Sequence, residues 1–200
     1  AAADGSHMSG AMIALMPTVE DAERLAIEGG EAAEDLHLTL YFLGDDGSAF
    51  SEAERAELLD ALKEAMTYND GPVHARAFGA AHWNAGSDSP SWVWSVGDDR
   101  DADPMDTSLH EAHHIATDAL AKMSFAQSLP MQHTPWQPHV CAAYSDELDL
   151  IIALEERLGP ITFDRIRVAF AGNYTDIPLS GRAVTAAADG PLRRQPTDLE

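Results

Sequence analysis

Hydrophobic and polar residues alternate with a period of two along several short stretches of this chain. That period is typical of β-strands with one buried face. The clearest alternation runs over residues 36–43. Weaker alternation or short apolar runs predict further strands at 12–17, 73–83, 91–97, 138–144, 161–171 and 174–184. In 161–171 the alternation changes register near Asp164, which predicts a β-bulge there.

Three other stretches carry apolar residues at helical spacing, and they predict helices over 51–68, 108–125 and 147–158. The first begins with Ser51 and Glu54, which have the spacing of a capping box. Strands therefore come mostly in pairs, separated by helices. This order favours an α+β fold with antiparallel sheets.

The strand at 36–43 has two chemically different faces. Leu36, Leu38, Leu40 and Phe42 form the apolar face, whereas His37, Thr39 and Tyr41 form the polar face. Residues i and i+2 of a strand point to the same side. We therefore expect the apolar face to pack on a core and the polar face to line a cleft.

A second tetrapeptide with the same logic occurs in the other half of the chain. His37-Leu38-Thr39-Leu40 is matched by His139-Val140-Cys141-Ala142. Each unit presents an imidazole beside a small hydroxyl or thiol group on one strand face. Two such units can bracket one phosphate group.

These paired motifs resemble the two-histidine (2H) phosphoesterase superfamily, which includes the 2'-5' RNA ligase-like proteins and cyclic nucleotide phosphodiesterases. The resemblance covers most of the chain, because segments 12–17, 37–44 and 138–140 lie where the family has similar segments. It implies two pseudo-duplicated lobes, with antiparallel sheets flanking a central cleft and helices on the outside. The implied activity is metal-independent hydrolysis of a small 2',3'-cyclic phosphate, or of a 2'-5'-linked or cyclic oligonucleotide.

The resemblance also assigns roles to the motif residues. His37 and His139 would act as general acid and general base, in an order that the sequence leaves open. Thr39 and Cys141 would bind the phosphate oxygens. Cys141 departs from the family pattern of threonine or serine, and a thiol is a poorer hydrogen-bond donor than a hydroxyl. The alternative is that His139 is a partly buried strand histidine and Cys141 an apolar filler.

Two aromatic residues are candidates for substrate binding. Strand parity places Tyr41 on the same face as His37 and Thr39. Trp136 lies just upstream of the second motif, where its ring can stack on a nucleobase. Packing at the rim or in the core explains Trp136 equally well.

Two other functions compete with the phosphoesterase hypothesis. His110, Glu111 and His114 match H-E-x-x-H, which places two histidines on one helix face for zinc and adds a glutamate base. A zinc hydrolase needs a third ligand, for which His133 is the nearby downstream candidate, and a solvated helix face explains the same cluster without metal. The other alternative is a nucleotide-binding protein that kept the cleft with weak or no catalysis.

Composition limits the partners of the chain. The 200 residues carry a formal net charge of −22, from 34 acidic and 12 basic residues. Such a charge repels a long polyanion, so no long nucleic acid is expected as a partner. It is compatible with the small nucleotide or short RNA end that the resemblance implies. No apolar run approaches the length of a membrane span, so no membrane partner is expected. The single cysteine excludes an internal disulfide, so we expect a cytoplasmic protein. The resemblance to the two-histidine phosphoesterases implies that the reaction needs no metal or other cofactor.

The expected domain organisation is simple. Residues 1–10 have the composition of a cloning scar or disordered leader, and residues 186–200 that of a disordered tail. Residues 11–185 would form a single bilobal domain. The oligomeric state is left open.

Overall fold

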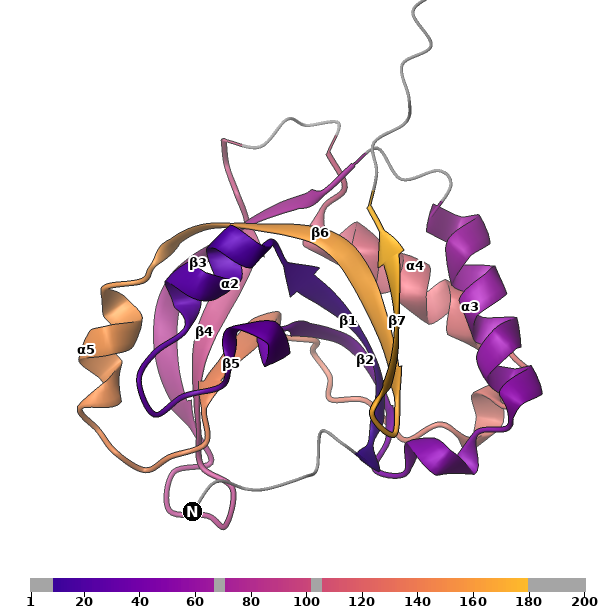
Figure 1. The fold of residues 1–200 in the computed structure, drawn as a ribbon, viewed down its shortest axis with the longest axis horizontal. Coiled ribbons are helices and arrows are strands. Elements are labelled where there is room, and N and C mark those ends of the chain that lie inside the picture. Colours follow the sequence, from indigo (N-terminus) through magenta and orange to yellow (C-terminus); the bar gives the residue numbers. More distant parts are fainter. Residues whose placement is uncertain (1–8, 67–70, 102–105, 180–200) are drawn as a thin grey trace, which may run out of the picture.

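The computed structural model describes residues 9–66, 71–101 and 106–179 (Figure 1). In these residues seven strands form one sheet in which every pairing is antiparallel. The strands are β1 (Ala11–Pro17), β2 (Leu38–Gly44), β3 (Val73–Trp83), β4 (Ser91–Asp98), β5 (His139–Ala143), β6 (Gly159–Phe170) and β7 (Asn173–Pro178). The predicted α+β class with antiparallel pairing is therefore confirmed.

The sheet curls into a barrel-like ring. Its strand order is β1-β2-β5-β4-β3-β6-β7, and β1 also pairs with β6, which closes the ring. The two halves expected from the sequence are thus continuous with each other. They meet where Leu38 of β2 pairs with Val140 of β5, so the two motif strands are neighbours.

The described residues also form four helices: α2 (Val19–Leu25), α3 (Glu52–Met66), α4 (Leu109–Ala121) and α5 (Leu150–Glu155). Figure 1 shows α3 and α4 together beside β1, β2 and β7, and α5 on the opposite side beside β3 and β4. Three 3-10 turns complete the described elements: η1 (Ala33–Asp35), η2 (Gly47–Ala49) and η3 (Ala126–Ser128). The three predicted helices correspond to α3, α4 and α5.

Side-chain caps explain where the two longest helices begin. The backbone N–H of Ser51 donates to the Glu54 carboxylate at 2.8 Å, and the N–H of Glu54 donates to the Ser51 hydroxyl at 3.3 Å. This is the reciprocal capping box that the sequence predicted. Ser108 caps α4 by accepting from the N–H of Glu111. Sequence analysis missed α2, although Thr18 caps it by the same three-residue spacing, accepting from the N–H of Asp21.

The apolar faces of the two motif strands lie in the hydrophobic core. Leu38, Leu40 and Val140 are buried in one cluster with leucines of α3 and α4. Full burial of each such side chain contributes roughly 1.5–3 kcal/mol to folding. Trp92 and Trp94 also lie in this core. The alternating positions, which carry the motif histidines, are therefore held on the concave side of the sheet.

A β-bulge in β2 changes one part of the predicted pattern. Ile13 of β1 pairs with Tyr41, and the next residue of β1 pairs with Thr39, so β2 contains an extra residue between them. Strand alternation reverses across such a bulge. As a result Tyr41 packs against the core, whereas Phe42 is 40% exposed. The prediction that Phe42 faces the core was therefore wrong, whereas Tyr41, although it packs partly on the core, still lines a surface groove together with Thr39.

The predicted bulge near Asp164 is confirmed. Met16 of β1 pairs with Arg165, and the next residue pairs with Phe163, so that Asp164 is the extra residue of β6. Several predictions lie outside the described residues: those for leader residues 1–8, for the end of the first long helix at 67–68, for strand residues 180–184 and for the tail 186–200. Within the described part of the chain, none of the helices has both the length and the apolar character needed to cross a bilayer.

Candidate active site

The structure brings the four motif side chains together. His37, Thr39, His139 and Cys141 all line one cavity of about 190 Å³. Residues of β1 and β6 complete its wall together with Phe42, Asp45 and Tyr144. Pockets for drug-sized ligands span roughly 300–1,000 Å³. A cavity of this smaller volume is suited to a phosphate group and its immediate substituents.

The two histidines are held by the same local hydrogen bond. Nδ1 of His37 donates to the carbonyl of Asp35 at 2.6 Å. Nδ1 of His139 donates to the carbonyl of Gln137 at 2.8 Å. In each motif the acceptor lies two residues before the histidine. A carbonyl partner keeps a proton on Nδ1 of a neutral imidazole, so Nε2 is the nitrogen that can exchange a proton with substrate.

His139 is partly buried in the second motif. Burial lowers the pKa of His139, and its hydrogen bond to the Gln137 carbonyl offsets part of that decrease. The ring of Trp83 covers it, with the two ring centroids 4.4 Å apart and the planes tilted by 52°. Desolvation disfavours the charged form of an imidazole, so His139 favours the neutral form that a general base requires.

Cys141 is a protonated thiol within this cavity. Burial raises the pKa of Cys141 to about 11, although a hydrogen bond from Tyr144 acts in the opposite direction. Sγ of Cys141 also lies 3.9 Å from the carbonyl oxygen of Ala143. A thiol with such a pKa is a weak nucleophile near neutrality, so the position is suited to contact with a phosphate oxygen.

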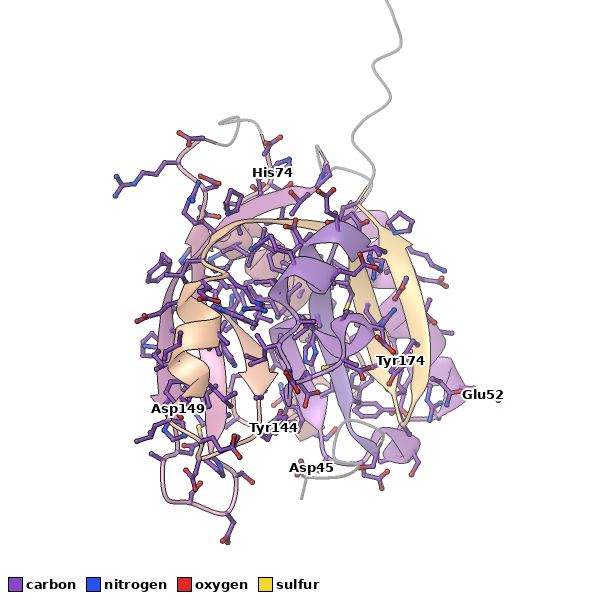
Figure 2. The ribbon with its side chains drawn as sticks, turned by 60° about the vertical axis from the view of Figure 1, so that its left-hand side comes forward. Asp45, Glu52, His74, Tyr144, Asp149 and Tyr174 are labelled. Atoms are coloured by element: carbon purple, nitrogen blue, oxygen red, sulfur yellow. The ribbon has the colours of Figure 1, made fainter. Side chains whose placement is uncertain are left out.

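Tyr144 is a cavity residue that sequence analysis missed. It lines the same cavity as the motif residues, and burial is the largest cause that raises its pKa. Figure 2 shows Tyr144 beyond the end of β5 and Asp45 beyond the end of β2, at the same end of the molecule. Alternation along the strand would put Tyr144 on the other face from His139 and Cys141. Because β5 ends at Ala143, this rule does not apply to Tyr144.

A larger groove of about 700 Å³ adjoins the cavity. The two share Thr39, Phe42 and His139 in their linings. The groove is lined mostly by aromatic, imidazole, amide and hydroxyl side chains, which include Tyr41, Trp83, Asn84, His113, Thr117, Gln132, His133 and Trp136. Its position makes it suited to the group attached to a phosphate that is bound between the histidines.

Both aromatic residues singled out from the sequence line this groove. The indole N–H of Trp136 donates to the carbonyl of Thr39 at 3.2 Å, which fixes its ring beside the first motif. Tyr41 reaches the groove instead of the smaller cavity because of the bulge in β2. Their role in substrate binding stays a prediction. Trp83 was missed, and its one sequence signal was its position as the last residue of the predicted strand 73–83.

Two histidines of α4, His110 and His113, pack against Trp136 in the groove wall. His113 stacks on Trp136 with centroids 4.2 Å apart and planes 15° apart, and His110 contacts the same indole edge-on at 5.7 Å. Burial lowers the pKa of His113, and the neighbouring His114 and His110 lower it further. Within the described residues, no group of three or more His, Cys, Asp or Glu side chains is placed to hold a metal ion. The three-ligand set that the zinc hypothesis requires is therefore not found in this part of the chain.

Comparison with known proteins relates this fold to solved structures. No family model and no curated protein sequence matches the chain. The structure of TT0787 from Thermus thermophilus matches with a TM-score of 0.55 and 18% identity, over 86% of this chain and 98% of that one. A structure described as a phosphoesterase matches with a TM-score of 0.50 and 17% identity, over 86% and 95% of the two chains. Escherichia coli LigT complexed with 3'-AMP has a TM-score of 0.49, with 17% identity and the same coverage.

The first two matches superpose over most of both chains and show a shared fold, whereas their low identity shows nothing about activity. The chain therefore shares its fold with TT0787 and with a solved phosphoesterase. The functions of His37, Thr39, His139 and Cys141 are argued from the cavity itself.

Proposed function

We propose that this protein is a metal-independent phosphoesterase that cleaves a small phosphodiester by general acid–base catalysis with two histidines. One observation carries the proposal: two imidazoles from separate strands, each held through Nδ1 by a backbone carbonyl, line one phosphate-sized cavity. The fold shared with a solved phosphoesterase supports it.

The proposed substrate is a small nucleotide: a 2',3'-cyclic phosphate, or a 2'-5'-linked or cyclic oligonucleotide. The groove beside the cavity offers Trp83, Trp136 and Tyr41 as surfaces on which a nucleobase can stack. A formal net charge of −22 disfavours binding of long RNA or DNA. A short RNA end with a terminal cyclic phosphate remains compatible with both features.

In the proposed mechanism His139 is the general base and His37 the general acid. Nε2 of His139 takes a proton from the attacking water or hydroxyl, whose oxygen forms the new bond to phosphorus. The bond from phosphorus to the leaving oxygen breaks, and that oxygen receives a proton from Nε2 of His37. The lowered pKa of His139 supports this order, because a base must be neutral at the start of the reaction.

Thr39 and Cys141 would stabilise the charge that develops on the non-bridging oxygens. The Thr39 hydroxyl is the stronger donor and the Cys141 thiol the weaker one. Tyr144, which hydrogen-bonds to the thiol, holds the sulfur in place. Asp45 is a carboxylate of the cavity wall, so a phosphate group that gains negative charge is repelled from that side.

The same cysteine gives a second candidate function some support. A cavity that keeps both histidines but has a thiol in place of one hydroxyl can bind a nucleotide and turn it over slowly. In that case the protein would be a nucleotide-binding protein with weak or no catalysis. Nucleotide that binds stoichiometrically and is recovered intact would favour this function over the first.

The experiment that tests the proposal is an activity assay on a panel of 2',3'-cyclic nucleotides, 2'-5'-linked oligoadenylates and cyclic dinucleotides, with and without EDTA. Wild type is compared with the His37→Ala/His139→Ala double variant. His74→Ala is the control, because Figure 2 shows His74 at the opposite end of the molecule from Tyr144. We expect turnover that survives EDTA, persists in the control and vanishes in the double variant. Turnover lost to EDTA would contradict the proposal and favour a metal-dependent reaction.

A further inference from the structure

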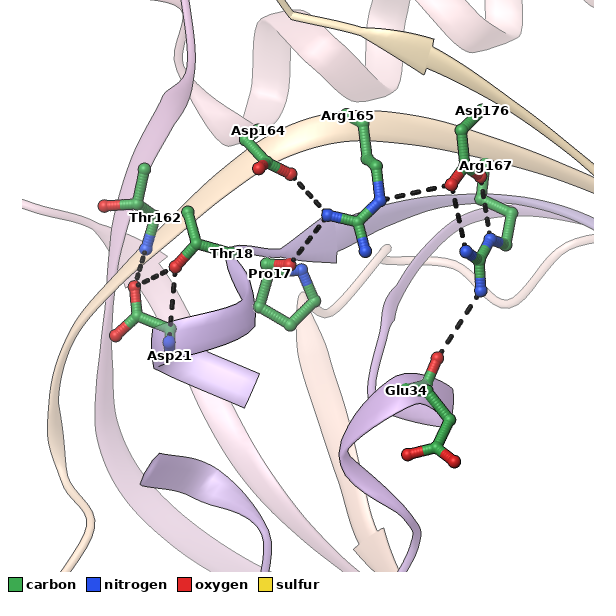
Figure 3. Close-up of polar contacts among 9 residues, drawn as sticks. All are labelled: Pro17, Thr18, Asp21, Glu34, Thr162, Asp164, Arg165, Arg167 and Asp176. Carbon is green, nitrogen blue, oxygen red and sulfur yellow. Dashed lines mark hydrogen bonds and ion pairs between the residues drawn. The ribbon is translucent and has the colours of Figure 1, made fainter. Parts of the chain in front are cut away.

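An arginine from the C-terminal strand pair reaches the turn that precedes the first motif. Nη1 of Arg167, in β6, donates to the carbonyl of Glu34 in η1 at 3.4 Å (Figure 3). The next carbonyl of the same turn, that of Asp35, accepts from Nδ1 of His37. Arg167 is therefore one peptide unit away from the hydrogen bond that orients the imidazole.

Arg167 is itself held firmly. Its Nε and Nη2 donate to the two carboxylate oxygens of Asp176, in β7, at 2.8 and 2.9 Å. Its guanidinium lies over the ring of Tyr174 with 4.9 Å to the centroid. A paired, two-bond contact of this kind fixes direction as well as distance. The hydrogen bonds between Arg167 and Asp176 raise the pKa of the arginine and lower that of the aspartate, so both stay charged near neutrality.

Arg167 and His37 also share a small pocket. Both line it, with Asp35 and Tyr174 among the neighbouring side chains. The arginine thus lies beside the imidazole as well as behind the turn that holds it. Figure 3 shows the arrangement from Asp176 through Arg167 to Glu34.

We propose that Arg167 is a positioning residue for His37. It holds η1 in place, and η1 keeps the carbonyl of Asp35 on Nδ1 of His37, so that Nε2 faces the reaction. The kinetic consequence rests on the proposed function, whereas the effect on the imidazole does not. No direct contact between Arg167 and the substrate is required.

The second motif provides an internal reference. The acceptor for His139 is the carbonyl of Gln137, in a segment that the sheet itself holds, because the N–H of Val96 donates to the carbonyl of Pro138 at 3.1 Å. Ser95 of β4 pairs with His139 in the ladder. Loss of Arg167 should therefore affect His37 and leave His139 unchanged.

The test compares Arg167→Gln and Arg167→Lys with Arg165→Gln. Arg165 is the matched control, since it lies on the same strand and also binds Asp176, at 3.2 Å, but reaches the carbonyl of Pro17 instead of η1. The primary measurement is the tautomer of each imidazole, from the ¹⁵N chemical shifts of its ring nitrogens. We expect wild type and the control to hold the proton of neutral His37 on Nδ1. We expect Arg167→Gln to show a mixture of both tautomers at His37 only.

The kinetic measurement uses whichever phosphodiester the wild type turns over. A misplaced reacting group lowers rate more than binding, so Arg167→Gln should lose about tenfold or more in kcat with KM nearly unchanged. Arg167→Lys should fall between wild type and the glutamine variant, because an ammonium group cannot reproduce the two-bond contact with Asp176.

Each result decides the proposal. An unchanged His37 tautomer in Arg167→Gln would overturn it. If the glutamine variant does not fold, Arg167→Lys decides instead, and a wild-type His37 tautomer together with a wild-type kcat in that variant would overturn the proposal. Equal changes in Arg165→Gln would show a general effect of the strand pair and would also overturn it. If wild type turns over no phosphodiester, the proposed function fails while the tautomer measurement still decides the role of Arg167.

Discussion

The two histidine motifs reach the same geometry by different means. His37 precedes β2 and bonds to η1, a short turn that also accepts a hydrogen bond from Arg167 of β6. His139 begins β5 and depends on a carbonyl held within the sheet, under the ring of Trp83. Both imidazoles carry the proton on Nδ1, and burial lowers the pKa of the second. Similar sequence motifs can thus supply one oriented pair whose members are held by different surroundings.

Removal of either imidazole is the most severe way to break this pairing. We expect His37→Ala and His139→Ala each to lower kcat by about 10²–10⁴-fold, the usual contribution of a positioned acid or base. Steady-state kinetics on the active substrate of the panel measures the loss. If a variant keeps more than about half of the wild-type kcat, the substituted histidine is not the general acid or base, because loss of such a group lowers the rate far more than twofold.

The first motif also supplies the stronger phosphate donor. Thr39→Val keeps the shape of the side chain and removes the hydroxyl, so we expect kcat to fall by about 10²-fold, as for loss of one donor to a developing oxyanion. Thr162→Val is the control, because the Thr162 hydroxyl contacts Nδ1 of His74 and the residue lines neither the cavity nor the groove. Equal rates in both variants would show that the hydroxyl of Thr39 does not act in the reaction.

The second motif offers the opposite change. Cys141→Thr replaces a weak donor by a hydroxyl and makes the two motifs alike, so we expect turnover to rise by about two- to tenfold, the value of one hydrogen bond. The assay is the same, with thermal unfolding as a check that the strand is intact. An unchanged or lower rate in a folded variant would show that position 141 does not contact the phosphate.

The smallest expected change concerns the acid limb of the pH profile. Because burial lowers the pKa of His139, the limb on which the base gains a proton lies below the ordinary histidine value of about 6.5. Trp83→Ala exposes the imidazole, so its pKa rises and the limb moves to higher pH, with kcat/KM at pH 6 falling relative to pH 7.5. The exposed Phe78 of the same strand gives the control, Phe78→Ala. A limb that stays in place would indicate that Trp83 does not desolvate His139.

Strand alternation and helix caps made much of the fold predictable. The motif histidines and their i+2 partners fall on the cavity side, as local parity requires, and Ser51 caps the helix that it was expected to cap. Local rules of this kind need no knowledge of distant neighbours. Alternation alone predicted that His37, Thr39, His139 and Cys141 face a cavity, and all four line it.

Features that depend on distant partners could not be predicted in the same way. The extra residue in β2 is defined by its pairing with β1, and it moves Tyr41 to the groove and Phe42 to the cavity. Trp83 meets His139 only because β3 and β5 both pair with β4. Arg167 reaches η1 from a strand that lies more than half the chain away. Pairing and closure of the sheet create these contacts, and alternation along one segment carries no information about them.

The most direct test of the paired-histidine account is the pH dependence of kcat/KM for wild type and the two single-histidine variants. The account predicts a bell-shaped wild-type profile, because one imidazole must be neutral and the other protonated. It further predicts that His139→Ala loses the acid limb and that His37→Ala loses the alkaline limb. A wild-type profile without two limbs, or one whose limbs both persist in each variant, would contradict the claim that these two histidines share the proton transfers.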